Sequence, residues 1–127
     1  EEGQVWEAAM FAAHYKLDNL VAILDWNGLQ IDGEITKVMN STPIDEKFKA
    51  FGWHVITADA HDFDSIESAF NEAKTVVGKP TVIIAKSVKG KGVSYMENKC
   101  EWHGQAPKED LYKVAISDLE KIAESLK

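Results

Sequence analysis

Residues 20–33 of this 127-residue chain read LVAILDWNGLQIDG, an apolar run followed at once by polar residues and two glycines. A continuous apolar run of this length is typical of a β-strand that is buried on both faces. Residues 3–17, which precede it, are rich in helix formers, so a helix leads directly into the strand. This succession indicates an α/β fold.

The same succession of helix and strand recurs further along the chain. Gly52 predicts the end of one helix, and Gly78-Lys79-Pro80 predicts a turn after the next helix. The further elements that the pattern predicts are a helix over 44–51, a strand over 53–57, a helix from Asp62 or Asp64 to about Val77, a strand over 81–85 and a closing helix from Glu109 to about Leu126.

Apolar strands that alternate with helices predict a parallel sheet with helices on both faces. In such a sheet, ligands bind outside the carboxyl ends of the strands. The segments 25–33, 58–64 and 86–104 should therefore share one edge of the sheet. No repeat or linker interrupts the chain, which predicts a single domain over residues 1–127.

Composition excludes several classes of protein. A net charge of −7 is the wrong sign for binding nucleic acid over a broad surface, and no apolar run is long enough to span a membrane. The single cysteine, Cys100, and the absence of a targeting segment favour a cytoplasmic location. All fourteen cationic residues are Lys, so a bound phosphate must be met by Lys, His, backbone N–H groups or a metal ion.

The first helix is apolar nearly all round, and a three-stranded sheet would leave unpaired edges. We therefore expect further strands upstream, a partner subunit, or both, to cover these surfaces. On this interpretation the chain is incomplete at its N-terminus.

Residues 25–33 bring a side-chain amide and two carboxylates, Asp25 and Asp32, to the expected ligand edge. A turn of this kind can offer the Asn27 side-chain oxygen and a backbone carbonyl two residues later to Mg²⁺. The alternative is a plain tight turn, because Asn-Gly is a common turn dipeptide.

Residues 86–93 alternate cations with glycines, so ammonium groups and backbone N–H groups could approach a phosphate together. The alternative is a solvated basic loop, since the order of residues is not that of a Walker loop.

Of the four histidines, His103 lies in a long segment without helix or strand pattern, where an imidazole can donate to a diphosphate or a substrate hydroxyl. The alternative is a structural histidine stacked on Trp102. His61 reads as part of a helix cap in which Glu67 follows Asp64, and His14 and His54 as packed core or interface residues.

Taken together, these segments resemble the thiamine-diphosphate-binding domain of transketolase along nearly the whole chain. The matching segments are Glu2-Gly3-Gln4-Val5-Trp6-Glu7-Ala8, Leu17-Asp18-Asn19-Leu20, residues 25–33, Phe51-Gly52-Trp53, Lys79-Pro80-Thr81, Lys89-Gly90-Lys91-Gly92 and Trp102-His103-Gly104-Gln105-Ala106-Pro107. The last segment distinguishes transketolase from many other thiamine enzymes.

The resemblance implies roles for particular residues. Asn27 would give its side-chain oxygen, and Leu29 its backbone carbonyl, to Mg²⁺, for which Ca²⁺ or Mn²⁺ could substitute. Ile31 would touch the thiazolium end of thiamine diphosphate, whereas Lys89 and His103 would lie near the diphosphate, with His103 also the expected catalytic residue. Glu2 and Glu7 resemble glutamates at the family's dimer interface.

The resemblance also implies what lies outside the chain. The Gly-Asp-Gly that should precede Glu1, and with it an aspartate ligand of Mg²⁺, is not in the sequence. We therefore expect residues 1–127 to be the C-terminal part of the cofactor domain, inactive alone. It would act on sugar phosphates with a pyrimidine-binding domain or subunit, as a homodimer or heterotetramer. The alternatives are a thiamine-dependent synthase and a non-catalytic α/β association module.

Overall fold

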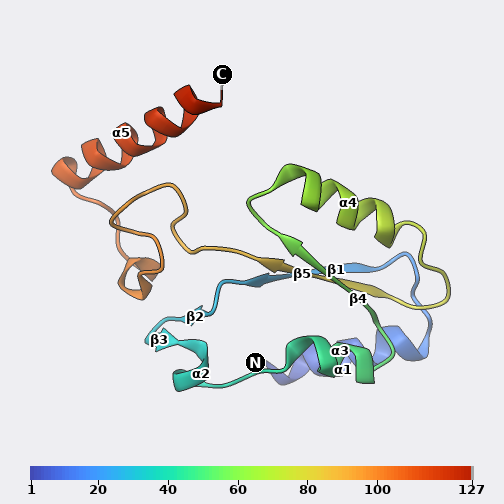
Figure 1. Ribbon diagram of the computed structural model, residues 1–127. Coiled ribbons are helices and arrows are strands. Elements are labelled where there is room, and N and C mark those ends of the chain that lie inside the picture. The colour runs from blue at the N-terminus through green and yellow to red at the C-terminus, as the bar shows by residue number, and fades with distance from the viewer. Residues whose placement is uncertain (127) are drawn as a thin grey trace. The chain divides into compact units, whose positions relative to one another are not determined.

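The computed structural model describes residues 1–126. This part of the chain forms two compact units, one built from residues 1–26 and 39–87 and the other from residues 27–38 and from residue 88 onward. Figure 1 shows the elements of both units in chain order. Neither unit contains a helix that is long and apolar enough to cross a membrane, within the residues described.

The first unit is built on a parallel three-stranded sheet. Its strands are β1 (Val21–Trp26), β4 (His54–Asp59) and β5 (Thr81–Lys86), in the spatial order β1-β5-β4. Ile83 in the middle of β5 pairs with Ile23 of β1 and with Ile56 of β4. The parallel α/β class predicted from the sequence is confirmed.

Helices cover both faces of this sheet (Figure 1). Helix α4 (Phe63–Ala73) lies on one face, whereas α1 (Gly3–His14) and α3 (Ile44–Ala50) lie on the other. Asp62 caps α4, since its side chain accepts a hydrogen bond from the backbone N–H of Asp64. The predicted capping chemistry is therefore present, with Asp62 rather than Asp64 as the capping residue.

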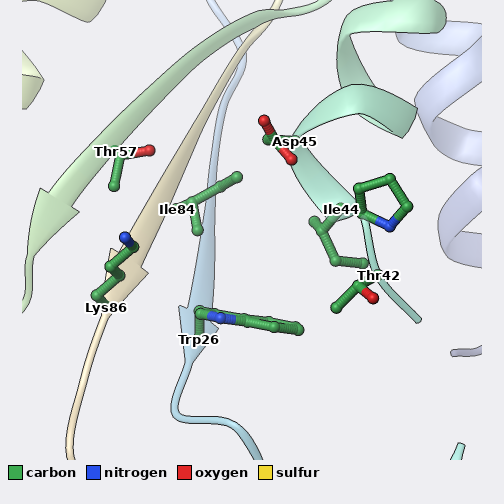
Figure 2. A pocket seen from close by; sticks show the side chains of 8 residues that line it. Trp26, Thr42, Ile44, Asp45, Thr57, Ile84 and Lys86 are labelled. Carbon is green, nitrogen blue, oxygen red and sulfur yellow. The ribbon is translucent and has the colours of Figure 1, made fainter. Parts of the chain in front are cut away.

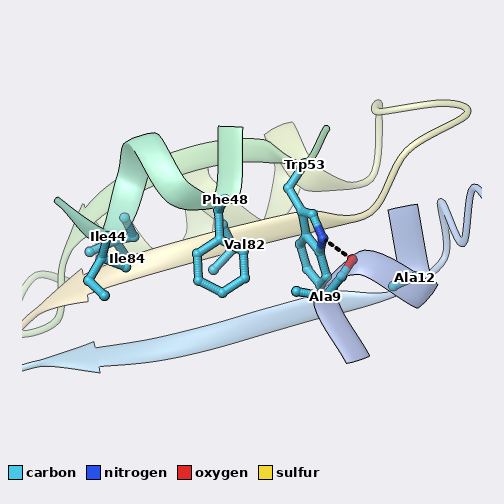
Figure 3. Close-up of a cluster of buried hydrophobic side chains, with 7 residues drawn as sticks. All are labelled: Ala9, Ala12, Ile44, Phe48, Trp53, Val82 and Ile84. Carbon is cyan, nitrogen blue, oxygen red and sulfur yellow. Dashed lines mark hydrogen bonds between the residues drawn. The ribbon is translucent and has the colours of Figure 1, made fainter. Parts of the chain in front are cut away.

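The larger core cluster lies between the sheet and the helices α1 and α3 (Figure 3). Trp53 is its polar anchor, because the indole Nε1 donates to the backbone oxygen of Ala9 at 2.9 Å. The Trp53 ring also packs edge-on against Phe48. A smaller cluster under α4 consists of Ile56, Ala58, Ala69, Ala73 and Ile83.

Two helices are shorter than the sequence predicts. Helix α1 ends at His14 instead of Leu17, because Lys16 adopts a left-handed φ of 51° and turns the chain. Helix α4 ends at Ala73 instead of Val77, and the Thr75 hydroxyl then bonds the backbone oxygen of Glu72. The three strands end one or two residues later than predicted, at Trp26, Asp59 and Lys86.

The expectation that all strands are buried on both faces holds only for the central strand. β5 is buried from Thr81 to Ile84, whereas Ile23 on β1 is 62% exposed. β1 and β4 are the edges of the described sheet, so each is covered by a neighbouring strand on one side only. Apolar side chains on α1, among them Val5 and Phe11, are also exposed. The prediction that another element covers these surfaces stays a prediction.

Neither His14 nor His54 lies in the core of this chain. His14 is exposed, with its ring edge-on to Tyr15. His54 is partly exposed, and its Nε2 lies 2.7 Å from a carboxylate oxygen of Glu72. The core interpretation is wrong for both within this chain, because an edge strand and a helix end leave room for solvent.

The second unit contains a hairpin that the sequence analysis did not predict. Its antiparallel strands are β2 (Leu29–Gln30) and β3 (Gly33–Glu34), followed by the short helix α2 (Ile35–Val38). Later in the chain come the 3₁₀ turn η1 (Cys100–His103) and the helix α5 (Glu109–Ser125). Two-residue strands are too short to produce a hydrophobic pattern, which is why the sequence did not reveal them.

Candidate functional site

One cavity of about 210 Å³ in the second unit brings together the five site residues predicted from the sequence. They come from two segments, the hairpin at residues 27–31 and the loop with the 3₁₀ turn at residues 89–103. Sequence reasoning missed two further lining residues, Gln30 and Cys100, because neither carried a motif signal. The full lining is Asn27, Leu29, Gln30, Ile31, Lys89, Cys100 and His103.

Asn27 begins the hairpin and orients its side chain through a local hydrogen bond. Its Oδ1 accepts the backbone N–H of Leu29 at 2.9 Å, while Gly28 between them has a φ of 73°. Asn27 and Gly28 thus form a bend before the hairpin, and the tight turn of the hairpin itself lies at Ile31 and Asp32 instead of at the Asn-Gly pair. An amide oxygen has two lone pairs, so Oδ1 can accept this bond and still face a cation.

The backbone of Leu29 points away from the partner strand. Leu29 pairs with Glu34, and the N–H of Ile35 bonds the carbonyl of Gly28 at 2.9 Å, so the ladder bonds flank the Leu29–Glu34 pair. The N–H and C=O of one strand residue point to the same side. The Leu29 carbonyl is thus directed to the side on which the Asn27 oxygen lies, as two ligands of one cation require.

Ile31 and Asp32 form the tip of the hairpin. Ile31 is 60% exposed and still lines the cavity. An apolar side chain at this position offers a contact surface for an apolar part of a ligand. Asp32 does not line the cavity, and Asp25 accepts a hydrogen bond from the Ser87 hydroxyl in the first unit. The two carboxylates of residues 25–33 are therefore not brought together at this cavity.

The glycine-rich loop after β5 folds on itself instead of remaining a solvated loop. Gly90 and Gly92 have φ values of 72° and 92°, and Val93 is buried. The expectation that its backbone N–H groups meet a phosphate is wrong for residues 91–93. Lys91 N donates to Val88 O, Gly92 N to the Glu97 carboxylate and Val93 N to Gly90 O. Of this loop, Lys89 is the residue that lines the cavity.

His103 ends the 3₁₀ turn and is exposed at the cavity. The ring that Trp102 packs against is that of Tyr95, with centroids 5.0 Å apart. The structure thus favours an imidazole that is available to a ligand over one stacked on Trp102. His61 lies outside this cavity, in the turn before α4, where its backbone N–H bonds the Asp59 carboxylate.

Helix α5 is hydrogen-bonded to the loop that carries Lys89. The Asp118 carboxylate accepts hydrogen bonds from the Ser94 hydroxyl at 2.6 Å and from its backbone N–H at 3.0 Å. These bonds lower the pKa of Asp118 below its ordinary value, because they favour the charged carboxylate. The Tyr95 hydroxyl adds a bond to the backbone oxygen of Leu111 at 2.9 Å.

A second cavity of about 370 Å³ lies in the first unit and contains none of the predicted site residues (Figure 2). Trp26, Ile44 and Ile84 form its apolar part, while Asp45 and Lys86 bring opposite charges to its rim. Lys49 donates a hydrogen bond to Asp45 at 3.0 Å, which lowers the pKa of that carboxyl. This balance of charges gives the cavity no preference for an anion.

The donor set at the smaller cavity suits the diphosphate end of a cofactor that is bound through a metal. It offers two neutral oxygen ligands, an ammonium group and an imidazole. Among residues 1–126, no group of three or more His, Cys, Asp and Glu side chains is placed to hold a metal ion. Asn27 and Leu29 would therefore form part of a coordination shell to which the ligand itself contributes oxygens.

Strands β1 and β5 of the parallel sheet lead along the chain into the two segments that line this cavity. The fold belongs to the α/β class, in which ligands bind in segments that follow the carboxyl ends of the strands. The chain belongs to the transketolase family: the family model described as "Transketolase, thiamine diphosphate binding domain" matches residues 1–119. The resemblance seen in the sequence is confirmed.

Relatives from bacteria support this assignment. The chain is 45% identical over 121 residues to the 6-deoxy-6-sulfo-D-fructose transketolase subunit SqwG of Clostridium sp. (strain MSTE9), covering 95% of this chain and 44% of that protein. It is 39% identical over 125 residues to an apulose-4-phosphate transketolase subunit of Phocaeicola vulgatus, covering 98% of this chain and 44% of that protein. The chain thus spans less than half the length of these relatives.

A solved structure agrees with the fold. The crystal structure of transketolase from Campylobacter jejuni matches 94% of this chain and 18% of its own, with a TM-score of 0.86 and 33% sequence identity.

Proposed function

We propose that this chain is part of the cofactor-binding domain of a transketolase that moves a two-carbon ketol unit from a ketose phosphate to an aldose phosphate. The observation that carries the proposal is that Asn27, Leu29, Ile31, Lys89 and His103, named from the family's motifs, line one cavity. When bound, thiamine diphosphate supplies a nucleophilic carbon and an electron sink for cleavage of the carbon–carbon bond.

Asn27 and Leu29 hold the metal in this proposal. The Asn27 Oδ1 is fixed by the Leu29 N–H, so its second lone pair faces a cation without further reorganisation. The Leu29 carbonyl adds a second oxygen on the same side. Mg²⁺ demands fixed octahedral geometry, which suits ligands that a hairpin holds in place.

Lys89 neutralises the diphosphate, and His103 handles protons at the substrate. An ammonium group close to a diphosphate supplies charge that a neutral amide cannot. An imidazole can both donate and accept a proton near neutral pH, which suits a reaction in which substrate hydroxyls change partners. Ile31 contacts the apolar ring portion of the cofactor.

The partners follow from the names of the relatives. Two of them are called subunits of transketolases, which supports a separate polypeptide or domain that completes the site in this protein. The exposed side chains on α1, Val5 and Phe11 among them, supply an apolar surface for association as a homodimer or heterotetramer. A net charge of −7 argues against nucleic acid as a partner, and we propose a cytoplasmic location for the protein and its sugar phosphates.

Calorimetric titration with thiamine diphosphate, with and without Mg²⁺, tests the proposal together with ketol transfer by the complete protein. We expect Mg²⁺-dependent binding that is lost in Asn27→Ala. His103→Ala should lower turnover more than cofactor affinity. His61→Ala is the matched control, since His61 lies outside the cavity. A folded protein that binds no cofactor would overturn the proposal and favour an association module.

A further inference from the structure

Part of the cavity lining comes from a loop whose two ends lie next to each other. Lys89 and His103 are far apart in sequence and line the same cavity. Between them the chain leaves at Lys89, folds through residues 90–97 and comes back at Asn98, whose backbone N–H bonds the Lys89 carbonyl at 2.9 Å. The 3₁₀ turn that ends at His103 begins two residues later, at Cys100. The bond at Asn98 therefore joins the two segments that carry the proposed diphosphate ligands.

Asn98 makes this bond in a left-handed conformation. Its φ is 56°, a value that glycine adopts freely, that Asn and Asp tolerate and that other residues adopt at a cost. Asn98 is also exposed, so its contribution comes from the backbone conformation and not from packing of its side chain. A residue that disfavours this conformation would open the loop where it closes.

The residues inside the loop pack closely, so a change of backbone conformation at Asn98 also displaces Lys89. A Cβ built on Gly90 would lie 2.7 Å from both the Cβ and the backbone oxygen of Met96, which shows how closely the two sides approach. The Glu97 carboxylate accepts the Gly92 N–H at 2.9 Å and lies 3.7 Å from Lys91 Nζ. The loop thus behaves as one piece whose two ends meet at Lys89 and Asn98.

We propose that Asn98 is a positioning residue for diphosphate binding: its left-handed backbone conformation closes the 89–98 loop and so fixes Lys89 beside the segment that carries His103. This inference rests on the proposed function, because it needs Lys89 to meet the diphosphate. Asn98 touches no ligand in this proposal and acts only through the Lys89 backbone.

The test compares Asn98→Val with Asn98→Gly in the complete protein, with thiamine diphosphate and Mg²⁺ as the probe. Asn98→Val should raise the Kd of the cofactor by about 5- to 30-fold, the factor that corresponds to the usual cost of a left-handed conformation. Asn98→Gly should stay within about threefold of the native Kd, because glycine adopts this φ freely. At saturating cofactor, kcat should be unchanged in both variants.

Lys16→Val is the matched control, since Lys16 also has a left-handed φ, of 51°, but lies in the first unit away from the cavity. It should lower stability without changing the cofactor Kd. Asn98→Ala repeats the test in a milder form if the valine variant does not fold. A native Kd in the folded valine or alanine variant, or an equal loss in the glycine variant, would overturn the inference.

Lys89→Ala separates this inference from the proposed function. If Lys89→Ala leaves the Kd unchanged, Lys89 is no diphosphate ligand and the positioning role of Asn98 fails, while the proposed function stands because the cofactor is still bound. If the folded native protein binds no cofactor, the proposed function fails. If Lys89→Ala weakens binding while Asn98→Val does not, the proposed function stands and only the positioning role of Asn98 is overturned.

Discussion

The side-chain oxygen of Asn27 accepts the backbone N–H of Leu29 at 2.9 Å, and this bond fixes the Asn27 amide beside the Leu29 backbone. The amide group is held in place before any ligand arrives, so little side-chain entropy remains to be lost on binding. The same bond orients the hairpin backbone whose Leu29 carbonyl lies on that side. The proposed metal ligands are thus organised by the hairpin itself.

Asn27→Ala removes one proposed metal ligand and the bond to Leu29 together. We expect the affinity for thiamine diphosphate in the presence of Mg²⁺ to fall by about 10- to 100-fold, because a contact to a charged group is lost. Asn27→Asp, which keeps the acceptor oxygen, should retain most of the affinity. Calorimetry at several Mg²⁺ concentrations distinguishes the two variants, and equal affinities for native protein and Asn27→Ala would remove Asn27 from the site.

Lys89→Gln tests whether the ammonium group at the cavity meets a diphosphate. We expect a weaker affinity for thiamine diphosphate and a shallower dependence of that affinity on salt, because one screened charge pair is gone. The measurement is the cofactor Kd between low and high ionic strength. Lys91→Gln is the control, since Lys91 belongs to the same loop but does not line the cavity. A salt dependence unchanged in Lys89→Gln would contradict the assignment.

Gly90→Ala should destabilise the second unit. An added Cβ would lie 2.7 Å from Met96 and would sit at a φ of 72°, so both sterics and conformation oppose it. We expect a loss of about 1–3 kcal/mol in the free energy of unfolding, measured in urea. Gly104→Ala has open space around its Cβ and no left-handed φ, so it should change stability little. Equal stabilities of the two variants would show that the close approach at Gly90 is relieved by movement of Met96.

Trp53→Phe tests the polar anchor of the larger core cluster (Figure 3). The substitution keeps a ring beside Phe48 but leaves the buried carbonyl of Ala9 without the indole donor. We expect a loss of about 0.5–1.5 kcal/mol in the free energy of unfolding, the usual net contribution of one hydrogen bond, because the Ala9 carbonyl lies inside α1 and keeps its bond within the helix. Urea denaturation measures this loss, and a stability equal to that of the native protein would mean that water reaches the Ala9 carbonyl.

Lowering the pH should weaken the hydrogen bonds between Ser94 of the loop and Asp118 of α5, because the Asp118 carboxylate becomes protonated. The pKa of Asp118 in the folded protein is lowered from 3.8 by its bonds from Ser94, so the charged form stabilises the fold. This contribution is present above pH 3.8 and is lost as the pH falls from there through the lowered pKa. NMR titration of the Asp118 carboxyl checks the direction. In Ser94→Ala the pKa of Asp118 should rise toward its ordinary value, and an unchanged pKa would show that Ser94 is not the cause of the shift.

The sequence alone determined the fold class and named the candidate residues of the site. The apolar runs at 20–24 and 81–85 have the length and uniformity of buried parallel strands, and both are found as β1 and β5. The residues Asn27, Lys89 and His103 could be named because the segments that contain them resemble motifs of a known family. Strand patterns and short motifs involve residues that are close together in the sequence, so these features could be predicted without a structure.

Only the tertiary structure decided which residues come together and which groups are already engaged. The backbone N–H of Gly92 looked available for a phosphate, but it is bonded by Glu97 from across the loop. Cys100 carries no motif signal and nevertheless lines the cavity with Lys89. Such pairings depend on where a loop closes, in this chain at the left-handed Asn98, and a backbone conformation of that kind arises from long-range packing that no periodicity in the sequence encodes.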